Sequence, residues 1–241
     1  MNYSDVIEYL KQNSDPSTAE FSSKLTPGAG FVYGVKLPLL RLLAKKLADE
    51  NWRNNLSMLL DNSQEEILLQ GFIIGVISEK IGRKSAKNYT PSLTEVFNLV
   101  AGCVEKINNW ALCDSFCSSL KFIKNYKVET YLFLNQFLYS QKEYQVRFAL
   151  VVFLMYYTDE EDVKKILPQL EKLCLTGYYA QMATAWLLQV YFVKQRNLTL
   201  RYLESFPLDN KILVKTIGKI CDSFRVDLSD KKFLREKIAQ F

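Results

Sequence analysis

Apolar residues recur along the chain with the three-to-four-residue spacing of amphipathic helices, and polar pairs mark where several of those helices begin. In a capping box a hydroxyl accepts from a backbone amide of the first turn and a glutamate reaches back to the cap. Three such pairs precede apolar stretches: Ser63 with Glu66, Ser92 with Glu95, and Thr158 with Glu161. Pro38 occupies the expected first position of a further leucine-rich helix. Alternation typical of strands is scarce, so the pattern predicts about a dozen helices joined by short loops.

The least regular stretch runs from Ser14 to Gly34. Its Pro27-Gly28-Ala29-Gly30 segment is unsuited to continuing a helix, so we expect it to separate a first short helix from the rest. No linker divides the chain further. We therefore predict one domain over residues 1–241.

Similar segments recur at an almost constant interval. From Gly71 to Trp110, Trp110 to Arg147 and Arg147 to Trp186 the offsets are 39, 37 and 39 residues. A period near forty is typical of two-helix HEAT-type repeats, which stack into a curved solenoid. The pattern predicts an all-α, HEAT-like repeat α-solenoid with a concave groove, in which Pro168 would bend the helix that begins at Thr158. Residues one period apart would then face the same groove.

Composition narrows the chemistry. The 241 residues are 49% hydrophobic with only 9 Gly and 6 Pro, which favours a folded, helix-rich protein. The chain has no histidine, which excludes Ser-His-Asp and Cys-His nucleophiles and histidine-containing metal sites. Any catalytic chemistry must therefore use carboxylates, Lys, Arg, Tyr, Cys or aromatic faces. The net charge of +5 is compatible with phosphate binding without requiring it.

The five cysteines are unclustered and lie in apolar runs, as expected of reduced thiols. Cys113 and Cys117, one helical turn apart, are interpreted as small buried side chains and not as metal ligands. The first residues do not resemble a secretory signal, and the longest apolar run, ten residues from Phe148 to Tyr157, is too short to span a bilayer. We expect a soluble cytoplasmic monomer without metal, cofactor or membrane contact.

Four ordered segments together resemble one family. They are Tyr33-Gly34-Val35-Lys36-Leu37-Pro38-Leu39-Leu40-Arg41, Asn109-Trp110-x-x-x-Asp114, Arg147-Phe148-Ala149, and Tyr178-Tyr179-x-x-Met182-Ala183-x-Ala185-Trp186. The order and spacing resemble those of the bacterial AlkD-type DNA alkylation repair proteins. The resemblance implies HEAT-like repeat DNA glycosylases that remove cationic N3- and N7-alkylated purines. Such proteins hold double-stranded DNA in a basic concave groove and do not flip the damaged base into a deep pocket.

The resemblance also implies roles for four residues, which would form the catalytic set. Asp114 would stabilise the oxocarbenium-like sugar and orient water. Trp110 and Trp186 would present aromatic faces to the cationic sugar and base, and Arg147 would grip a phosphate. Because an alkylated purine is already a charged leaving group, no histidine is needed to protonate it.

The residues taken singly leave other interpretations open. Trp186 lies in an apolar segment typical of the core, and Asp114 could be a surface or inter-helix carboxylate. Arg147 precedes ten apolar residues, so its charge should be paired, with Asp114 or a phosphate as natural partners.

Basic residues that could track phosphates also occur outside this set. Candidates for DNA contact are Lys211, Lys215 and Lys219, which share a helical stripe, and Arg41 with Lys45. Solvated lysine faces without a binding role have the same appearance.

One departure from the family pattern bears on function. The active glycosylases are understood to carry a short minor-groove recognition helix before the Gly-Val-x-x-Pro motif. We expect this chain to lack it, because Phe21 to Gly30 ends in helix breakers and offers one basic residue, Lys24. The favoured hypothesis is a glycosylase-like protein that binds DNA weakly and excises little. The alternatives are an active alkylpurine glycosylase and a HEAT-repeat protein-binding scaffold.

Overall fold

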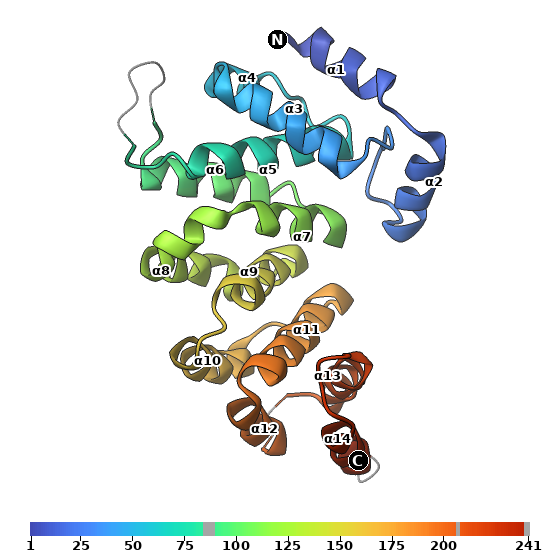
Figure 1. The fold of residues 1–241 in the computed structure, drawn as a ribbon, viewed down its shortest axis with the longest axis vertical. Coiled ribbons are helices and arrows are strands. Elements are labelled where there is room, and N and C mark those ends of the chain that lie inside the picture. The colour runs from blue at the N-terminus through green and yellow to red at the C-terminus, as the bar shows by residue number, and fades with distance from the viewer. Residues whose placement is uncertain (84–89, 206–207, 239–241) are drawn as a thin grey trace. The chain divides into compact units, whose positions relative to one another are not determined.

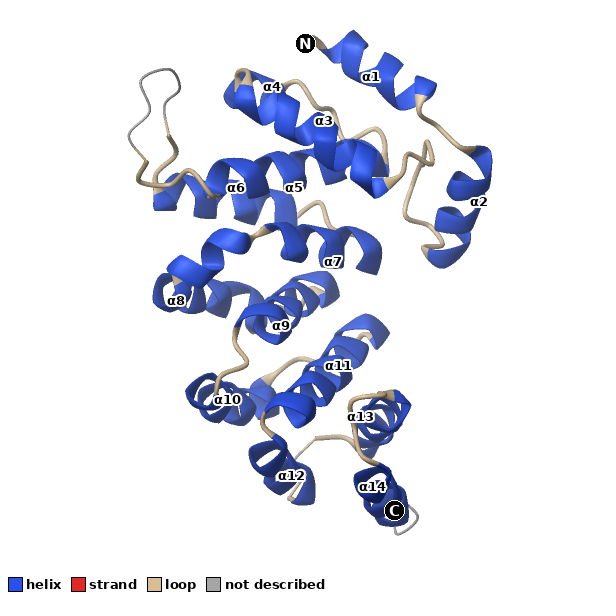
Figure 2. Cartoon of the chain, in the orientation of Figure 1, coloured by secondary structure: helices blue, strands red, loops and turns tan. Residues whose placement is uncertain are grey.

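The computed structural model describes residues 1–83, 90–205 and 208–238. Every regular element in these ranges is a helix, as predicted, and no strand occurs in them (Figure 2). The chain divides into two compact units, Met1–Tyr126 and Lys127–Phe241, and each is described by itself. The single domain predicted over residues 1–241 stays a prediction.

The first unit holds seven α-helices and one 3-10 helix in its described residues (Figure 1). They are α1 (Tyr3–Gln12), α2 (Pro16–Leu25), α3 (Leu37–Asp49), α4 (Trp52–Ser57), α5 (Gln64–Ser78), α6 (Leu93–Val104), α7 (Trp110–Ser119) and η1 (Lys121–Asn125).

The second unit continues with the same type of element, again counted over its described residues (Figure 1). The helices are α8 (Lys127–Leu138), α9 (Glu143–Tyr156), α10 (Glu160–Ile166), the 3-10 helix η2 (Leu167–Lys172), α11 (Tyr178–Lys194), α12 (Arg196–Glu204), α13 (Asn210–Asp222) and α14 (Leu228–Ile238).

Alternate helices pack against one another inside each unit. Helix α5 contacts both α3 and α7, and α11 contacts both α9 and α13. Helices α5 and α9 are apolar on nearly all sides, as expected of helices with neighbours all round. The markers Gly71, Trp110, Arg147 and Trp186 fall on α5, α7, α9 and α11. This alternation is compatible with stacked helix pairs, and the HEAT-like repeat and its concave groove stay predictions.

Two glycines allow α5 to approach α7 closely. A Cβ built on Gly71 would lie 2.8 Å from Cδ2 of Phe116, and one on Gly75 would lie 2.8 Å from the backbone oxygen of Ser119. The hydroxyl of Ser119 uses this proximity to donate to the carbonyl of Gly71 at 3.4 Å. The sequence marker Gly71 and the nearby Gly75 are therefore packing residues that set the position of α7.

The expectation that the stretch before the Gly-Val-x-x-Pro motif lacks a helix is wrong. Residues Pro16–Leu25 form α2, with Asp15 as its N-cap and Pro16 at its start. The Asp15 carboxylate accepts from the backbone amide and hydroxyl of Ser17 and from the hydroxyl of Thr18, and these hydrogen bonds lower the pKa of Asp15. The helix breakers act only after Leu25, so the irregular segment is shorter than expected.

The predicted helix starts are mostly confirmed. Ser63 and Ser92 cap α5 and α6 by accepting from the amides of Glu66 and Glu95. The prediction for Thr158 is off by one, because Asp159 is the cap and three acidic residues occupy the first turn of α10. Pro168 coincides with the change from α10 to the 3-10 helix η2.

The predicted burial of Cys113 and Cys117 is also confirmed. Cys113 and Cys117 are both fully buried, and all five thiols are free. Burial raises the pKa of the Cys103 thiol to about 12. No helix in the described part of the chain combines the length and apolar character needed to cross a membrane.

We predict that Gly75→Ala destabilises the protein although alanine favours helix, because its Cβ would overlap Ser119. Such overpacking costs about 1–3 kcal/mol. Gly102→Ala is the matched control: its Cβ meets nothing within 4 Å, so the free energy of unfolding should rise by up to about 1 kcal/mol. Urea denaturation followed by circular dichroism measures both, and equal stability of the two variants would contradict this packing.

A second prediction concerns the ion pair between α12 and α14. Arg196 donates from Nε to Asp230 at 2.7 Å, and this contact lowers the pKa of the Asp230 carboxyl. A lowered pKa in the folded state contributes stability above the ordinary value of 3.8 that is lost as the pH falls through the lowered value. Asp230→Asn should cost about 0.5–1 kcal/mol at pH 7. The difference from wild type should shrink below pH 3.8, and a difference that grew on acidification would contradict the assignment.

Candidate functional site

The start of α7 is fixed by its N-cap, Asn109. Its Oδ1 accepts from the amide of Leu112 at 3.0 Å, and its Nδ2 donates to Oε1 of Gln64 at 3.2 Å. Asn109 is buried, so both contacts are shielded from water. This cap fixes the first turn of α7, which carries Trp110, against α5.

Trp110 is half-buried and connects α7 to α2. Its Nε1 donates to the carbonyl of Leu25, the last residue of α2, at 3.1 Å. The indole also lines a cavity of about 160 Å³ together with Thr18 and Ser22 of α2 and Lys36. Helix α2, which the sequence pattern does not predict, is thus in direct contact with a predicted catalytic residue.

The segment that carries the Gly-Val-x-x-Pro motif is held by a buried carboxylate. Glu65 of α5 accepts from the backbone amides of Tyr33, Gly34 and Val35 at 2.8–3.3 Å. Gly34 has a φ of 84°, and a Cβ there would lie 2.3 Å from the carbonyl of Asp15. Only glycine suits this position, which brings the motif against the start of α2.

Asp114 is partly exposed and lies one turn after Trp110. Trp110, Asp114 and Ser118 are spaced four residues apart and therefore share one face of α7. Arg41 reaches that face from α3, because its Nη2 donates to Oγ of Ser118 at 3.0 Å while its guanidinium lies 4.1 Å from the ring centre of Phe72. The structure thus brings Arg41, predicted to bind DNA, to the face of α7 that carries the predicted carboxylate.

Arg147 belongs to the second unit and is only 6% exposed. Its Nη1 donates to the backbone carbonyl of Tyr179 in the first turn of α11 at 3.1 Å. Tyr144, on the same helix as Arg147, stacks on the ring of Tyr179 with ring centres 5.6 Å apart. This geometry favours a role in positioning α11 over the bidentate phosphate contact that the family resemblance implies.

The N-terminus of α11 already has an anionic partner. Oε1 of Glu143 accepts from the backbone amides of Tyr179 and Ala180. A carboxylate at this point complements the positive end of the helix dipole, as a bound phosphate would. These amides of α11 therefore stabilise the fold, and they are not available to bind a phosphate.

Trp186 is half-buried and faces cationic side chains of α13. It lines a cavity of about 360 Å³ together with Lys219, while Lys215 lies 5.9 Å from the ring centre of Tyr178. Lys211 is exposed at the start of α13, and Lys45 is exposed on α3 of the first unit. Tyr178 and Trp186 of α11 thus lie beside Lys215 and Lys219, two of the three α13 lysines that are predicted to contact DNA.

The four predicted catalytic residues are divided between the units. Trp110 and Asp114 lie on α7 in the first unit, and Arg147 and Trp186 lie on α9 and α11 in the second. In the first unit Lys36 lines a cavity with Trp110, and Arg41 binds Ser118 one turn after Asp114. In the second unit Lys219 lines a cavity with Trp186. The assembly of all four into one site stays a prediction.

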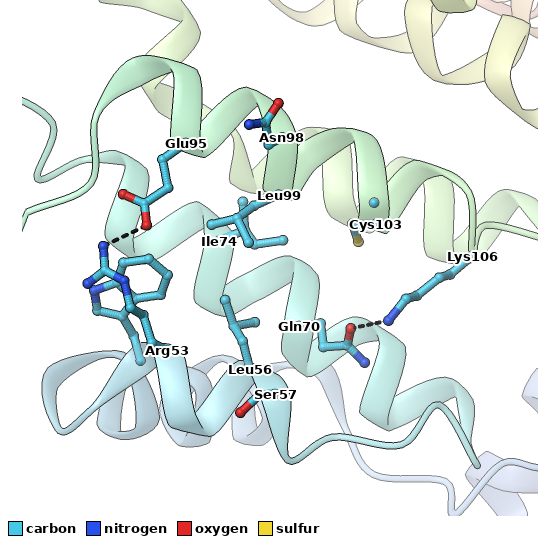
Figure 3. A pocket seen from close by; sticks show the side chains of 12 residues that line it. Arg53, Leu56, Ser57, Gln70, Ile74, Glu95, Asn98, Leu99, Cys103 and Lys106 are labelled. Carbon is cyan, nitrogen blue, oxygen red and sulfur yellow. Dashed lines mark hydrogen bonds and ion pairs between the residues drawn. The ribbon is translucent and has the colours of Figure 1, made fainter.

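A separate cavity of about 420 Å³ lies among α4, α5 and α6 of the first unit (Figure 3). At one end Arg53 pairs with Glu95 at 2.6 Å, and at the other Lys106 donates to Gln70 at 2.6 Å (Figure 3). Lys106 also pairs with Asp61 at 2.8 Å. These charges compensate one another, and no predicted catalytic residue lines this cavity.

Several residues of these surfaces were not found by sequence reasoning. Glu65 and Glu143 occur in ordinary helical stretches, and only the fold shows that they bind backbone amides of distant segments. Phe224 and Arg225 occupy an exposed turn after α13. The sequence signal for this turn is Phe224, an apolar residue within a polar segment. Over residues 1–83, 90–205 and 208–238 no cluster of three or more Cys, Asp or Glu could hold a metal ion.

Comparison with known proteins identifies a family. The family model described as DNA alkylation repair enzyme matches residues 6–217, a range that covers most of each unit and contains all four predicted catalytic residues. No curated protein matches the chain.

We predict that Arg147→Ala lowers the free energy of unfolding by about 2 kcal/mol or more, because it removes a buried charged donor and its packing. Lys211→Ala, an exposed cation of the same unit, should change stability by less than about 0.5 kcal/mol. Thermal or urea denaturation measures both. An unchanged stability of Arg147→Ala with a large loss of DNA affinity would instead support the phosphate contact.

Proposed function

The chain belongs to the DNA alkylation repair enzyme family, and from this premise we propose that it binds alkylated double-stranded DNA and releases cationic N3- or N7-alkylpurines slowly. The observation that carries the proposal is the Trp110–Asp114 face of α7 within a family match over residues 6–217. In this proposal DNA is the partner, and neither a cofactor nor a metal is required.

The proposed chemistry suits the residues available. Departure of an already cationic base leaves positive charge on the sugar, and the Asp114 carboxylate stabilises that charge and orients the attacking water. Trp110 and Trp186 offer aromatic faces to the cation. Neither role requires a proton donor, in keeping with a chain without histidine.

Two observations favour slow excision and weak binding. The lone lysine of α2, Lys24, pairs with Glu20 at 2.6 Å, so this helix brings no net charge to a phosphate backbone. Arg147 is buried against Tyr179. Phosphate contacts supply much of the affinity of DNA-binding proteins and nearly all of its salt dependence, so a protein with few of them binds weakly and with a shallow salt slope.

An efficient glycosylase is the second candidate, and the presence of α2 favours it. This helix lies before the Gly-Val-x-x-Pro motif, where the family's recognition helix is expected, and it contacts Trp110 through Leu25. The two candidates differ in rate and share the requirement for Asp114.

The test is release of 7-methylguanine from a duplex under single-turnover conditions, scored as abasic sites. We expect slow release by wild type and a loss of about a hundredfold or more in Asp114→Asn. Asp227→Asn, an exposed carboxylate of the second unit, is the matched control and should match wild type. Release complete within seconds would favour the efficient enzyme. Equal rates for Asp114→Asn and wild type would overturn the role of Asp114.

A salt series with undamaged duplex distinguishes DNA binding from a protein-binding scaffold. Binding that weakens linearly with the logarithm of salt concentration indicates phosphate contacts. Absence of binding even at low salt would reject DNA as the partner.

A further inference from the structure

The turn between α13 and α14 exposes an aromatic ring to solvent. Phe224 has a relative exposure of 103%, although phenylalanine is among the residues most often buried. The turn is not loose, because the Ser223 hydroxyl accepts from the amide of Arg225 at 3.3 Å and Val226 behind it is buried. The backbone thus directs Phe224 away from the core.

This turn forms one wall of the cavity that contains Trp186. The cavity of about 360 Å³ is lined by Trp186 and Gln189 of α11, by Lys219 and Asp222 of α13, and by residues 223–225 of the turn. Its size is at the lower end of the range for pockets that hold small ligands, enough for one nucleotide but not for a helix. Two aromatic side chains and two cations therefore border a single hollow.

The cations of this cavity have no anionic side chain bound within hydrogen-bond distance in the part of the chain that the structure describes. The ion pairs found there do not include Lys219 or Arg225. Asp222 is the one acidic residue of the lining, so the local charge is +1. An anionic group can therefore bind there without displacing an existing partner.

We propose that this cavity binds one nucleotide of a DNA strand, with its phosphate between Lys219 and Arg225 and Phe224 stacked on an unpaired base. The proposal rests on the proposed function for the identity of the polymer. Aromatic rings beside cations suit a nucleotide, whose base has an apolar face and whose phosphate is anionic. An acidic peptide would use the cations and leave Phe224 without a role.

The principal test measures the affinity of the full chain for two labelled duplexes, one fully paired and one with a single unpaired base, by fluorescence anisotropy. Phe224→Ala should weaken binding of the duplex with the unpaired base by about fivefold or more and should affect the paired duplex less. Leu132→Ala is the matched control, an exposed apolar residue on α8 that is 64% exposed. It should leave both affinities unchanged, and because both side chains are exposed, both variants should fold.

Two charge variants test the phosphate position. Arg225→Gln should reduce the slope of log affinity against log salt by about one. Asp222→Asn should strengthen binding at low salt, because it removes the acidic group of the cavity. A loss of affinity in Asp222→Asn would contradict the assignment of an anion to this site.

The outcomes separate this inference from the proposed function. Equal affinities of Phe224→Ala and wild type for both duplexes overturn the inference, even if 7-methylguanine release depends on Asp114. A selective effect of Phe224→Ala supports it, even if wild type releases no base. If Arg225→Gln weakens binding of polyglutamate as much as of DNA while Phe224→Ala weakens neither, the turn binds acidic polymers generally and the inference fails.

Discussion

Close contact between alternate helices determines where the candidate residues lie. At Gly71 and Gly75 the backbone of α5 comes so close to α7 that no side chain fits between them, and close-packed interiors relax little around such points. Asn109 then caps α7 against Gln64 of α5. This contact determines the positions of Trp110 and Asp114 on α7. In the second unit the packing of α11 against α9 and α13 does the same for Trp186 and the lysines of α13.

Two carboxylates, one buried and one partly buried, complete this framework by binding backbone amides. Glu65 holds the segment from Tyr33 to Val35, and Glu143 holds the first turn of α11. Charge-assisted hydrogen bonds of this kind are strong in a water-poor interior. In the proposed complex with DNA, no phosphate binds at the first turn of α11, because Glu143 already occupies this helix terminus. Cations that are available for phosphate in the second unit therefore lie on α13 and the turn after it, beside Trp186.

Much of the fold was accessible from sequence because its signals are local. The hydroxyl caps of α5 and α6 follow from residues three positions apart in the chain. Helix α2 was missed because the cap Asp15 and the following Pro16 were given less weight than the later Pro27 and glycines. The burial of Arg147 and the grouping of Trp186, Lys219 and Phe224 depend on tertiary contacts, which a periodic pattern does not encode.

In the proposed reaction a carboxylate and aromatic faces act on a leaving group that already carries its charge. The most direct measurement compares base release from two duplexes of one sequence, one with cationic 7-methylguanine and one with a neutral lesion such as uracil. Because the chain lacks histidine and the proposed site includes no proton donor, release of 7-methylguanine alone is the predicted result. Comparable release of the neutral base would contradict the account.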